Sequence, residues 1–334
     1  SVIQKYDAKQ VAELHRLSWN LGEAPLLFVV TPDEILIYNN YETPQVIENG
    51  NLDPTAGIIE TLSLTDGLVS QQLALKKYHR SLLESGEYWR QSMTRFNAQN
   101  RVDATLISNL RIMRRTLINQ ISKRCDKSKE IITGVVHALL SRSIFIKYLE
   151  ERKDSNGETV FPQDFYCNFM ESAKWYTDVL NSKEATYNLF RILKDKFNGD
   201  TLQVSEIETE IITQDDLDEL RTFILGNSEL ESRQLTLWPL YSFDIIPIQL
   251  ISSIYELFFH LSDEEDEKGT YYTPLHLVNL VMDEVYPWEG KYKDISFFDP
   301  SCGSGIFLVE AYRRLVCRNP ITRYFISIKT RIIS

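Results

Sequence analysis

The feature that most constrains this chain is a strand–turn–helix pattern near its C-terminal end. Residues 294–299 (DISFFD) predict a short buried strand, residues 300–305 (PSCGSG) a turn, and residues 306–312 (IFLVEAY) a helix. In open α/β sheets, ligands bind beyond the carboxyl ends of the strands, beside the first glycine-rich turn. Gly303 and Gly305 allow a tight turn and a close approach of backbone to ligand. The pattern fits either a plain strand-to-helix connection or a cofactor site at a helix N-terminus.

Two sequence segments together resemble the DNA N6-adenine methyltransferases, which include type I modification subunits and fused type II restriction–modification enzymes. One segment, DPSCGSGIFL, begins at Asp299, and the other, GTYYTP, ends at Pro274, about 25 residues upstream. In that family the first segment is the main S-adenosylmethionine (SAM) motif, and the second caps the methionine end of the cofactor. The resemblance therefore implies a SAM site made by Tyr272, Thr273, Pro274, Asp299, Pro300, Cys302, Gly303 and Gly305.

The activity that the resemblance implies is methyl transfer from SAM to N6 of adenine in double-stranded DNA. Such an enzyme belongs to a restriction–modification or phage-defence system, and it extrudes the target base from the duplex before the transfer. A protein or RNA methyltransferase shares part of this chemistry. The GTYYTP segment and the long helical part before it favour DNA.

The resemblance extends upstream and covers roughly residues 130–315. Residues 197–200 (FNGD) resemble a loop of the family, residues 244–256 resemble one of its helices, and residues 139–150 resemble a helix of the longer fused enzymes. We therefore expect a multi-domain α/β protein. Its expected parts are a small N-terminal α/β unit at 1–70, a helical domain at 71–235 that is basic in its first half, and the beginning of a Rossmann-like SAM-dependent methyltransferase domain at 236–334.

Hydrophobic spacing predicts most of the other elements. Between the glycine turn and the N-terminus, we expect helices at 8–21, 129–152, 244–260 and 275–286, several helices between 168 and 226, and a hairpin of strands at 26–30 and 35–38. One further helix has an apolar stripe of Leu106, Leu110, Met113, Leu117 and Ile121. Arg142 lies near the apolar side of its helix, which predicts a buried arginine paired with a carboxylate rather than a phosphate ligand.

The charge of the chain is unevenly distributed. The 334 residues hold 36 Lys and Arg against 47 Asp and Glu, a formal net charge of −11. Residues 76–153 alone hold 17 Lys and Arg against 7 Asp and Glu. Within this basic block, Arg111, Arg114 and Arg115 fall largely off the apolar stripe of their helix. They form either a solvated helix face or a DNA-binding face whose affinity falls steeply with salt.

One motif of the resembled family is missing from the sequence. The family binds the target adenine with (N/D)PP(Y/F), and the printed chain has no such motif and no DNA target-recognition region. We therefore expect a chain that ends just after its SAM motif, is inactive alone and binds SAM weakly or not at all. It would be a truncated or frameshifted product or one piece of a split enzyme, completed by a missing C-terminal half or a specificity subunit. The alternative is a non-catalytic DNA- or protein-binding remnant or subunit of such a system.

The composition and spacing of the remaining residues argue against several other kinds of site and protein. The four cysteines are far apart and the five histidines are scattered, so we expect free thiols and no metal site. No catalytic residue is assigned. No strand carries the metal-binding carboxylates and lysine of a nuclease, and no apolar stretch is long enough to predict a membrane span. We expect a cytoplasmic protein.

Overall fold

A computed structural model of the chain describes residues 2–22, 24–47, 50–65, 73–92, 94–154, 156–197, 202–226, 238–247, 251, 273, 275–289, 296–300 and 305–318. The chain divides into two compact units, Ser1–Pro247 and Ile248–Ser334. Each unit is described by itself. The predicted boundary after residue 235 falls in a stretch outside the described residues, and the predicted three-part division stays a prediction.

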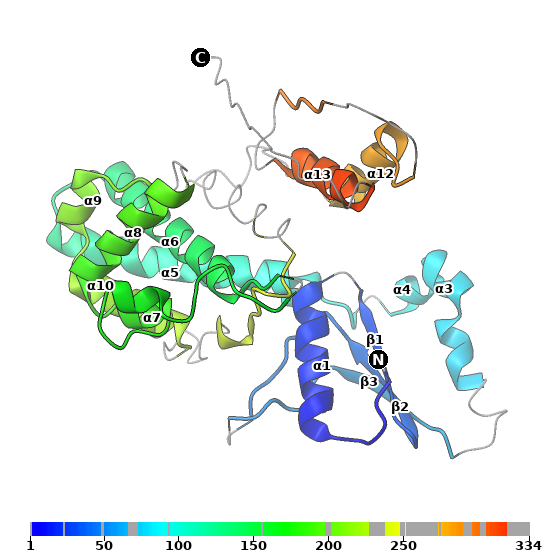
Figure 1. The fold of residues 1–334 in the computed structure, drawn as a ribbon. Helices are drawn as coiled ribbons and strands as arrows, with labels where there is room; N and C mark the ends of the chain where they lie inside the picture. Colours follow the sequence, from blue (N-terminus) through cyan, green and yellow to red (C-terminus); the bar gives the residue numbers. More distant parts are fainter. Residues whose placement is uncertain are drawn as a thin grey trace. The chain divides into compact units, whose positions relative to one another are not determined.

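The first unit opens with a helix on a small antiparallel sheet (Figure 1). Helix α1 is Ala8–Leu21, and the sheet has the order β1 (Leu26–Val30), β2 (Glu34–Asn39) and β3 (Ile58–Ser63). Asp7 caps α1, because its carboxylate accepts a 3.0 Å hydrogen bond from the Lys9 amide. The predicted helix at 8–21 and the predicted hairpin are confirmed. Strand β3 was not predicted.

Successive side chains of β2 point to opposite faces of the sheet, and both faces are covered. Leu36 and Tyr38 pack with Val11 of α1, whereas Ile37, between them, packs with aromatic residues on the opposite face. That second cover is made by residues 73–97, which include Tyr78 and Tyr88. They carry three short elements, η1 (Lys76–Tyr78), α3 (Arg80–Glu84) and α4 (Glu87–Gln91).

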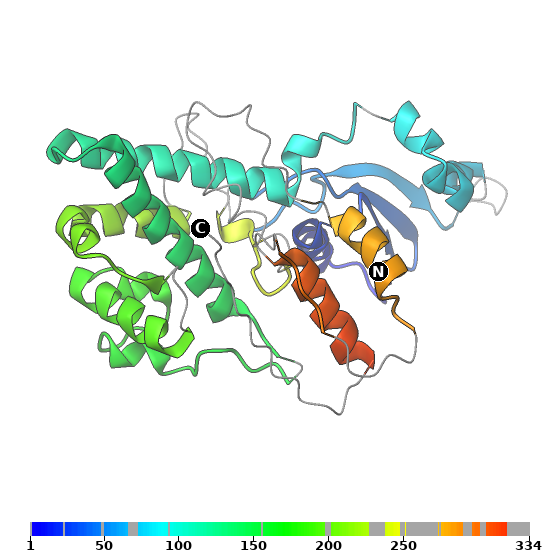
Figure 2. The same cartoon turned by 90° about the horizontal axis from the view of Figure 1, so that it is seen from above.

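Two long helices form the centre of the helical part of the first unit (Figure 2). They are α5 (Val102–Arg124), preceded by η2 (Ala98–Asn100), and α6 (Lys129–Glu151). All five residues of the predicted α5 stripe are buried, which confirms that helix and its apolar face. Helix α6 is long and apolar enough to cross a membrane by length and composition, but 67% of that stretch is buried inside the unit. Such burial is typical of a core helix in a soluble fold.

Shorter helices pack around this pair. They are η3 (Phe165–Asn168), α7 (Tyr176–Val179), α8 (Lys183–Phe197), α9 (Glu206–Ile211), α10 (Gln214–Ile224) and η5 (Trp238–Leu240). The predicted helices between 168 and 226 are thus confirmed. Helix α10 begins with a capping box in which Thr213 and Asp216 satisfy each other's backbone amides.

The segment after η5 is held by three different helices, and we call residues 240–244 the anchored segment. From α1, Asn20 and Arg16 both donate to the Leu240 carbonyl, at 2.9 and 3.1 Å. From α5, Asn109 donates to the Tyr241 hydroxyl at 2.8 Å. From the end of α6, Glu151 accepts the Phe243 amide at 3.0 Å, and Arg152 donates to the Asp244 carbonyl at 2.7 Å. The small α/β part and the helical part of the first unit therefore meet on one short stretch of chain.

The described part of the second unit is a pair of packed helices. They are α12 (Leu275–Val285) and α13 (Ile306–Arg318), which confirm the two helices predicted there. Their shared core is Val278, Met282, Tyr286, Ile306 and Ala311.

Two predictions around these helices are only partly visible. The buried strand predicted at 294–299 is not found at its described residues, because 296–299 form no strand there and Phe298 is 87% exposed. Of the predicted helix 244–260, residues 244–246 form a turn and a bend, Ile251 is helical, and residues 248–250 and 252–260 lie outside the described residues.

Candidate functional site

Of the turn predicted at 300–305, the structure describes Pro300 and Gly305, and Gly305 directly precedes α13. Gly305 has φ +80°, a left-handed conformation that side chains rarely adopt. Its carbonyl accepts the Val309 amide at 2.9 Å, which closes the first turn of the helix. Within the described residues, a Cβ at Gly305 would meet no heavy atom within 4 Å. The positive φ is therefore the reason that the described structure gives for a glycine at this position.

Only half of the predicted cofactor residues can be located in the structure. Thr273 and Asp299 are half-buried, Pro300 is exposed, and Gly305 is partly buried. The others, Tyr272, Pro274, Cys302 and Gly303, lie outside the described residues. The two predicted segments are each followed directly by a helix, and α12 and α13 share one hydrophobic core. Both segments thus belong to a single packed unit.

Sequence reasoning missed a buried, multiply bonded arginine in the described part of this unit. Arg314 of α13 is 0% exposed and donates from Nε to Glu310 Oε1 at 3.0 Å. Its Nη1 donates to the Tyr286 carbonyl at 2.9 Å and lies 2.8 Å from Asp283 Oδ1. The guanidinium also stacks over the Trp288 ring, 4.8 Å from its centroid. The available signal was an i,i+4 acid–base pair on the predicted helix.

The basic face predicted on α5 is only partly present. Arg115 is exposed and Arg111 is half-buried. Arg114 is only 4% exposed, and its Nη1 lies 3.4 Å from His137 Nε2 of α6. The expectation that all three arginines share a DNA-facing surface is therefore wrong for Arg114, which joins two core helices instead. Arg111 and Arg115 lie one turn apart on the same side of α5.

Eight basic side chains of residues 76–153 form ion pairs inside the first unit. Several partners come from outside that block, so a charge count along the sequence overstates the basic surface. The ion pairs are Lys77–Glu60, Arg80–Glu84, Arg90–Glu87, Arg101–Asp103, Arg124–Asp216, Lys127–Glu210, Arg142–Glu208 and Lys147–Glu150.

Arg142 confirms its prediction as a buried partner of a carboxylate. It is 0% exposed, pairs with Glu208, and donates to the Gln203 carbonyl at 2.6 Å. The Tyr187 hydroxyl donates to the same glutamate at 3.2 Å. Burial raises the pKa of Glu208, and the adjacent guanidinium of Arg142 opposes that rise. This pair ties α6 to α9 and has no opening toward a ligand.

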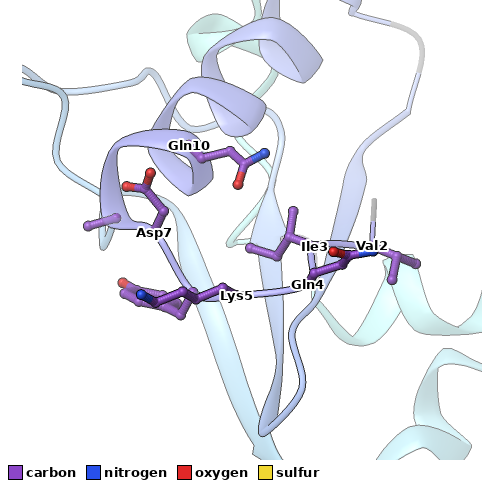
Figure 3. A pocket seen from close by; sticks show the side chains of 8 residues that line it. Val2, Ile3, Gln4, Lys5, Asp7 and Gln10 are labelled. Atoms are coloured by element: carbon purple, nitrogen blue, oxygen red, sulfur yellow. The ribbon is translucent and has the colours of Figure 1, made fainter.

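A hollow at the N-terminal segment contains no predicted site residue (Figure 3). Its volume is about 770 Å³, and it is lined by residues 2–8 and Gln10. Asp7 is the charged group at its helix end, and its carboxylate is already used to cap α1. No group of three or more His, Cys, Asp or Glu side chains that could hold a metal occurs within the described residues.

Comparison with known proteins supports a family for the second unit. Residues 247–325 match the family model described as N-6 DNA Methylase, whose members normally use SAM. The matched span includes α12, α13 and the glycine turn. No curated protein and no solved structure matches the chain.

Proposed function

We propose that this chain carries the SAM-binding part of a DNA adenine-N6 methyltransferase of a restriction–modification or phage-defence system. The observation that carries the proposal is the left-handed Gly305 at the start of α13, inside the span that matches the N-6 DNA methylases. The first amides of α13, which follow Gly305, have no acceptor within the helix. Those amides can bind polar groups of a ligand.

The roles of the individual residues follow from their positions. Asp299 supplies a carboxylate that accepts hydrogen bonds from an ammonium or hydroxyl group, and Thr273 lies two residues before Leu275, the first residue of α12. SAM, when bound, supplies a methyl group activated by its sulfonium. The chain holds that cofactor and excludes water from one side of it. Its contribution to the rate is therefore to align the methyl group for transfer.

Positioning of the target adenine belongs to a segment with the (N/D)PP(Y/F) motif, which the printed sequence does not contain. We therefore propose that residues 1–334 transfer no methyl group by themselves and act together with a segment or subunit that supplies this motif. If the purified chain methylated adenine in duplex DNA by itself, this part of the proposal would be wrong.

Arg111 and Arg115 are proposed to contact the DNA backbone. They are accessible, one turn apart, and neither belongs to the ion pairs described above. Replacing both by glutamine should weaken binding of a duplex oligonucleotide for any sequence and lower the slope of log K against log salt by about 2. Arg80→Gln is the control, because Arg80 is exposed but paired with Glu84 at 2.6 Å. An unchanged salt slope in the double variant would rule out this surface.

Calorimetry of the full chain with SAM tests the cofactor site. We expect micromolar binding, and at least a tenfold loss for Gly305→Ala because alanine is strained at φ +80°. Gly157→Ala is the matched control, since Gly157 has φ +82° and also no neighbour within 4 Å, but lies in the first unit. Absence of heat with SAM, together with retained DNA binding, would favour the non-catalytic DNA-binding alternative.

A further inference from the structure

A second hollow in the first unit is lined by residues of α8, of α9 and of the segment just before α9 (both helices are labelled in Figure 1). Its volume is about 220 Å³, below the roughly 300–1,000 Å³ of a pocket that encloses a whole cofactor. Helix α8 contributes Arg191 and Lys194 to the lining. Ser205, Glu206 and Thr209 contribute two hydroxyls and one carboxylate. The hollow therefore suits a small polar ligand that carries negative charge.

The two cations of this hollow take no part in holding the fold together. Arg191 and Lys194 are exposed and lie one turn apart on α8. Neither side chain forms an ion pair or a hydrogen bond with another residue in the part of the chain that the structure describes. Glu206 lines the same hollow and makes no ion pair with either of them. Their donors are therefore available to a ligand.

The dipole of α8 does not by itself explain these two cations. A cation in the last turn of a helix is stabilised by the dipole whatever its side chain contacts, and this effect fades beyond that turn. Lys196 is such a cation, and its Nζ lies 5.7 Å from the centroid of the Phe197 ring rather than in the lining of the hollow. Arg191, in contrast, precedes the last turn and still lines the hollow. The hollow thus gathers positive charge that the helix end does not require.

The opposite wall of the hollow is held in place by a buried network. Arg142 is 0% exposed, donates to the Gln203 carbonyl at 2.6 Å and pairs with Glu208 of α9. Ser205, between these two positions, caps α9 because its Oγ accepts the Glu208 amide at 3.1 Å. The Ser205 hydroxyl proton stays available to a ligand. A wall that is already ordered lowers the entropic cost of binding.

We propose that this hollow binds a small phosphate ester that also carries a hydroxyl group. The planar guanidinium of Arg191 matches two phosphate oxygens, and the Lys194 ammonium adds a point charge. The Glu206 carboxylate only accepts hydrogen bonds, so it repels a bare phosphate and accepts the proton of the ligand's hydroxyl. The phosphodiester backbone of DNA has no free hydroxyl along its length and fits this lining less well. The site is independent of the proposed function, because it uses neither the SAM residues nor Arg111 and Arg115.

Calorimetry of the full chain with ribose 5-phosphate tests the proposal, with inorganic phosphate and ribose as comparison ligands. We expect ribose 5-phosphate to bind more tightly than either of them. The double variant Arg191→Gln/Lys194→Gln should raise its dissociation constant at least about 10-fold, because the charge-assisted hydrogen bonds are lost. Lys196→Gln is the matched control, since it removes an exposed cation of the same helix end outside the hollow, and it should change the constant less than about 2-fold. Glu206→Ala should tighten inorganic phosphate and abolish the preference for ribose 5-phosphate.

Each other outcome overturns the proposal. Ribose 5-phosphate that bound no more tightly than ribose would show that the hollow is not a phosphate site. Equal affinities of the wild type and the Arg191→Gln/Lys194→Gln variant would place the ligand elsewhere on the chain. A chain that ignored ribose 5-phosphate, but whose double variant lost affinity for duplex DNA, would assign the two cations to DNA contact instead. All these cations are exposed, so the variants should keep the wild-type midpoint of urea unfolding, which is measured alongside.

Discussion

Replacing Asn20 by leucine tests how strongly the anchored segment holds the first unit together. Asn20 is 0% exposed, and its Nδ2 donates to the carbonyls of Arg16 and Leu240, at 2.8 and 2.9 Å. Its Oδ1 accepts the Ser242 amide at 2.8 Å. Leucine has a similar volume but cannot form any of these bonds. The substitution therefore removes hydrogen bonds without opening a large cavity.

The expected loss can be worked out from these contacts. Two hydrogen bonds between α1 and the anchored segment contribute about 1 kcal/mol each. The Ser242 amide then lacks its side-chain acceptor, which costs about 1–3 kcal/mol, while the Leu240 carbonyl keeps its bond from Arg16. We expect a total loss of about 3 kcal/mol in the free energy of unfolding. For a unit of this size, that loss lowers the Tm by about 6–12 °C.

The assay is urea and thermal unfolding followed by circular dichroism. Asn119→Leu is the control, because Asn119 is an exposed helical asparagine in the same unit, and its change should stay within about 0.5 kcal/mol. If Asn20→Leu cost less than 1 kcal/mol, or no more than the control, the anchored segment would not be a principal link between its three helices.

Three further substitutions test other parts of the first unit. Gly57→Ala should cost about 3 kcal/mol in unfolding free energy, because Gly57 has φ +80° and a Cβ there would lie 2.9 Å from His15 Cε1. Gly86→Ala is the matched control: Gly86 has φ +78° but no neighbour within 4 Å, and the change should cost about 1 kcal/mol. Burial lowers the pKa of His15 from 6.5 to about 4, so stability should fall by up to about 3 kcal/mol as the pH drops from 6.5 to 4; urea titrations of His15→Phe should show a smaller fall. Tyr241→Phe removes the acceptor of the Asn109 amide and should lower the midpoint of urea unfolding, with a loss of about 1.5 kcal/mol; an unchanged midpoint would contradict the bond.

The helices could be predicted from the sequence because their information is local. The α5 stripe repeats every three or four residues, and each of its members is buried. Strand β3 could not be predicted in the same way. Its place in the sheet depends on pairing with β2, for example Glu34 with Ser63, which the spacing within residues 58–63 does not encode.

The error at Arg114 has a different physical cause. The sequence suggests one buried side for α5, but this helix packs against both α6 and α10, so burial extends beyond the stripe to Asn109 and Arg114. The surplus of positive charge in residues 76–153 was a misleading guide to the surface for a related reason. Its partners Glu208, Glu210 and Asp216 are distant in sequence and become neighbours only in the folded unit.

The candidate site likewise combines features with a local sequence signal and features that depend on residues distant in the sequence. The glycine turn could be predicted because a left-handed residue before a helix has a strong local signature, and Gly305 adopts that conformation. The contacts of Arg314 could not be predicted, because its partners Asp283, in α12, and Tyr286, just after α12, lie some 30 residues earlier in the sequence.

The anchored segment also bears on how the chain folds while it is being synthesised. The bonds from Arg16 and Asn20 to Leu240 join residues separated by 224 and 220 positions. The N-terminal helix therefore leaves the ribosome long before its buried asparagine and its Trp19 ring can meet their partners, Leu240 and Tyr241. Contacts of such high sequence separation form late and slow the completion of folding. Until then, that face of α1 is exposed on the nascent chain and is a natural target for chaperones.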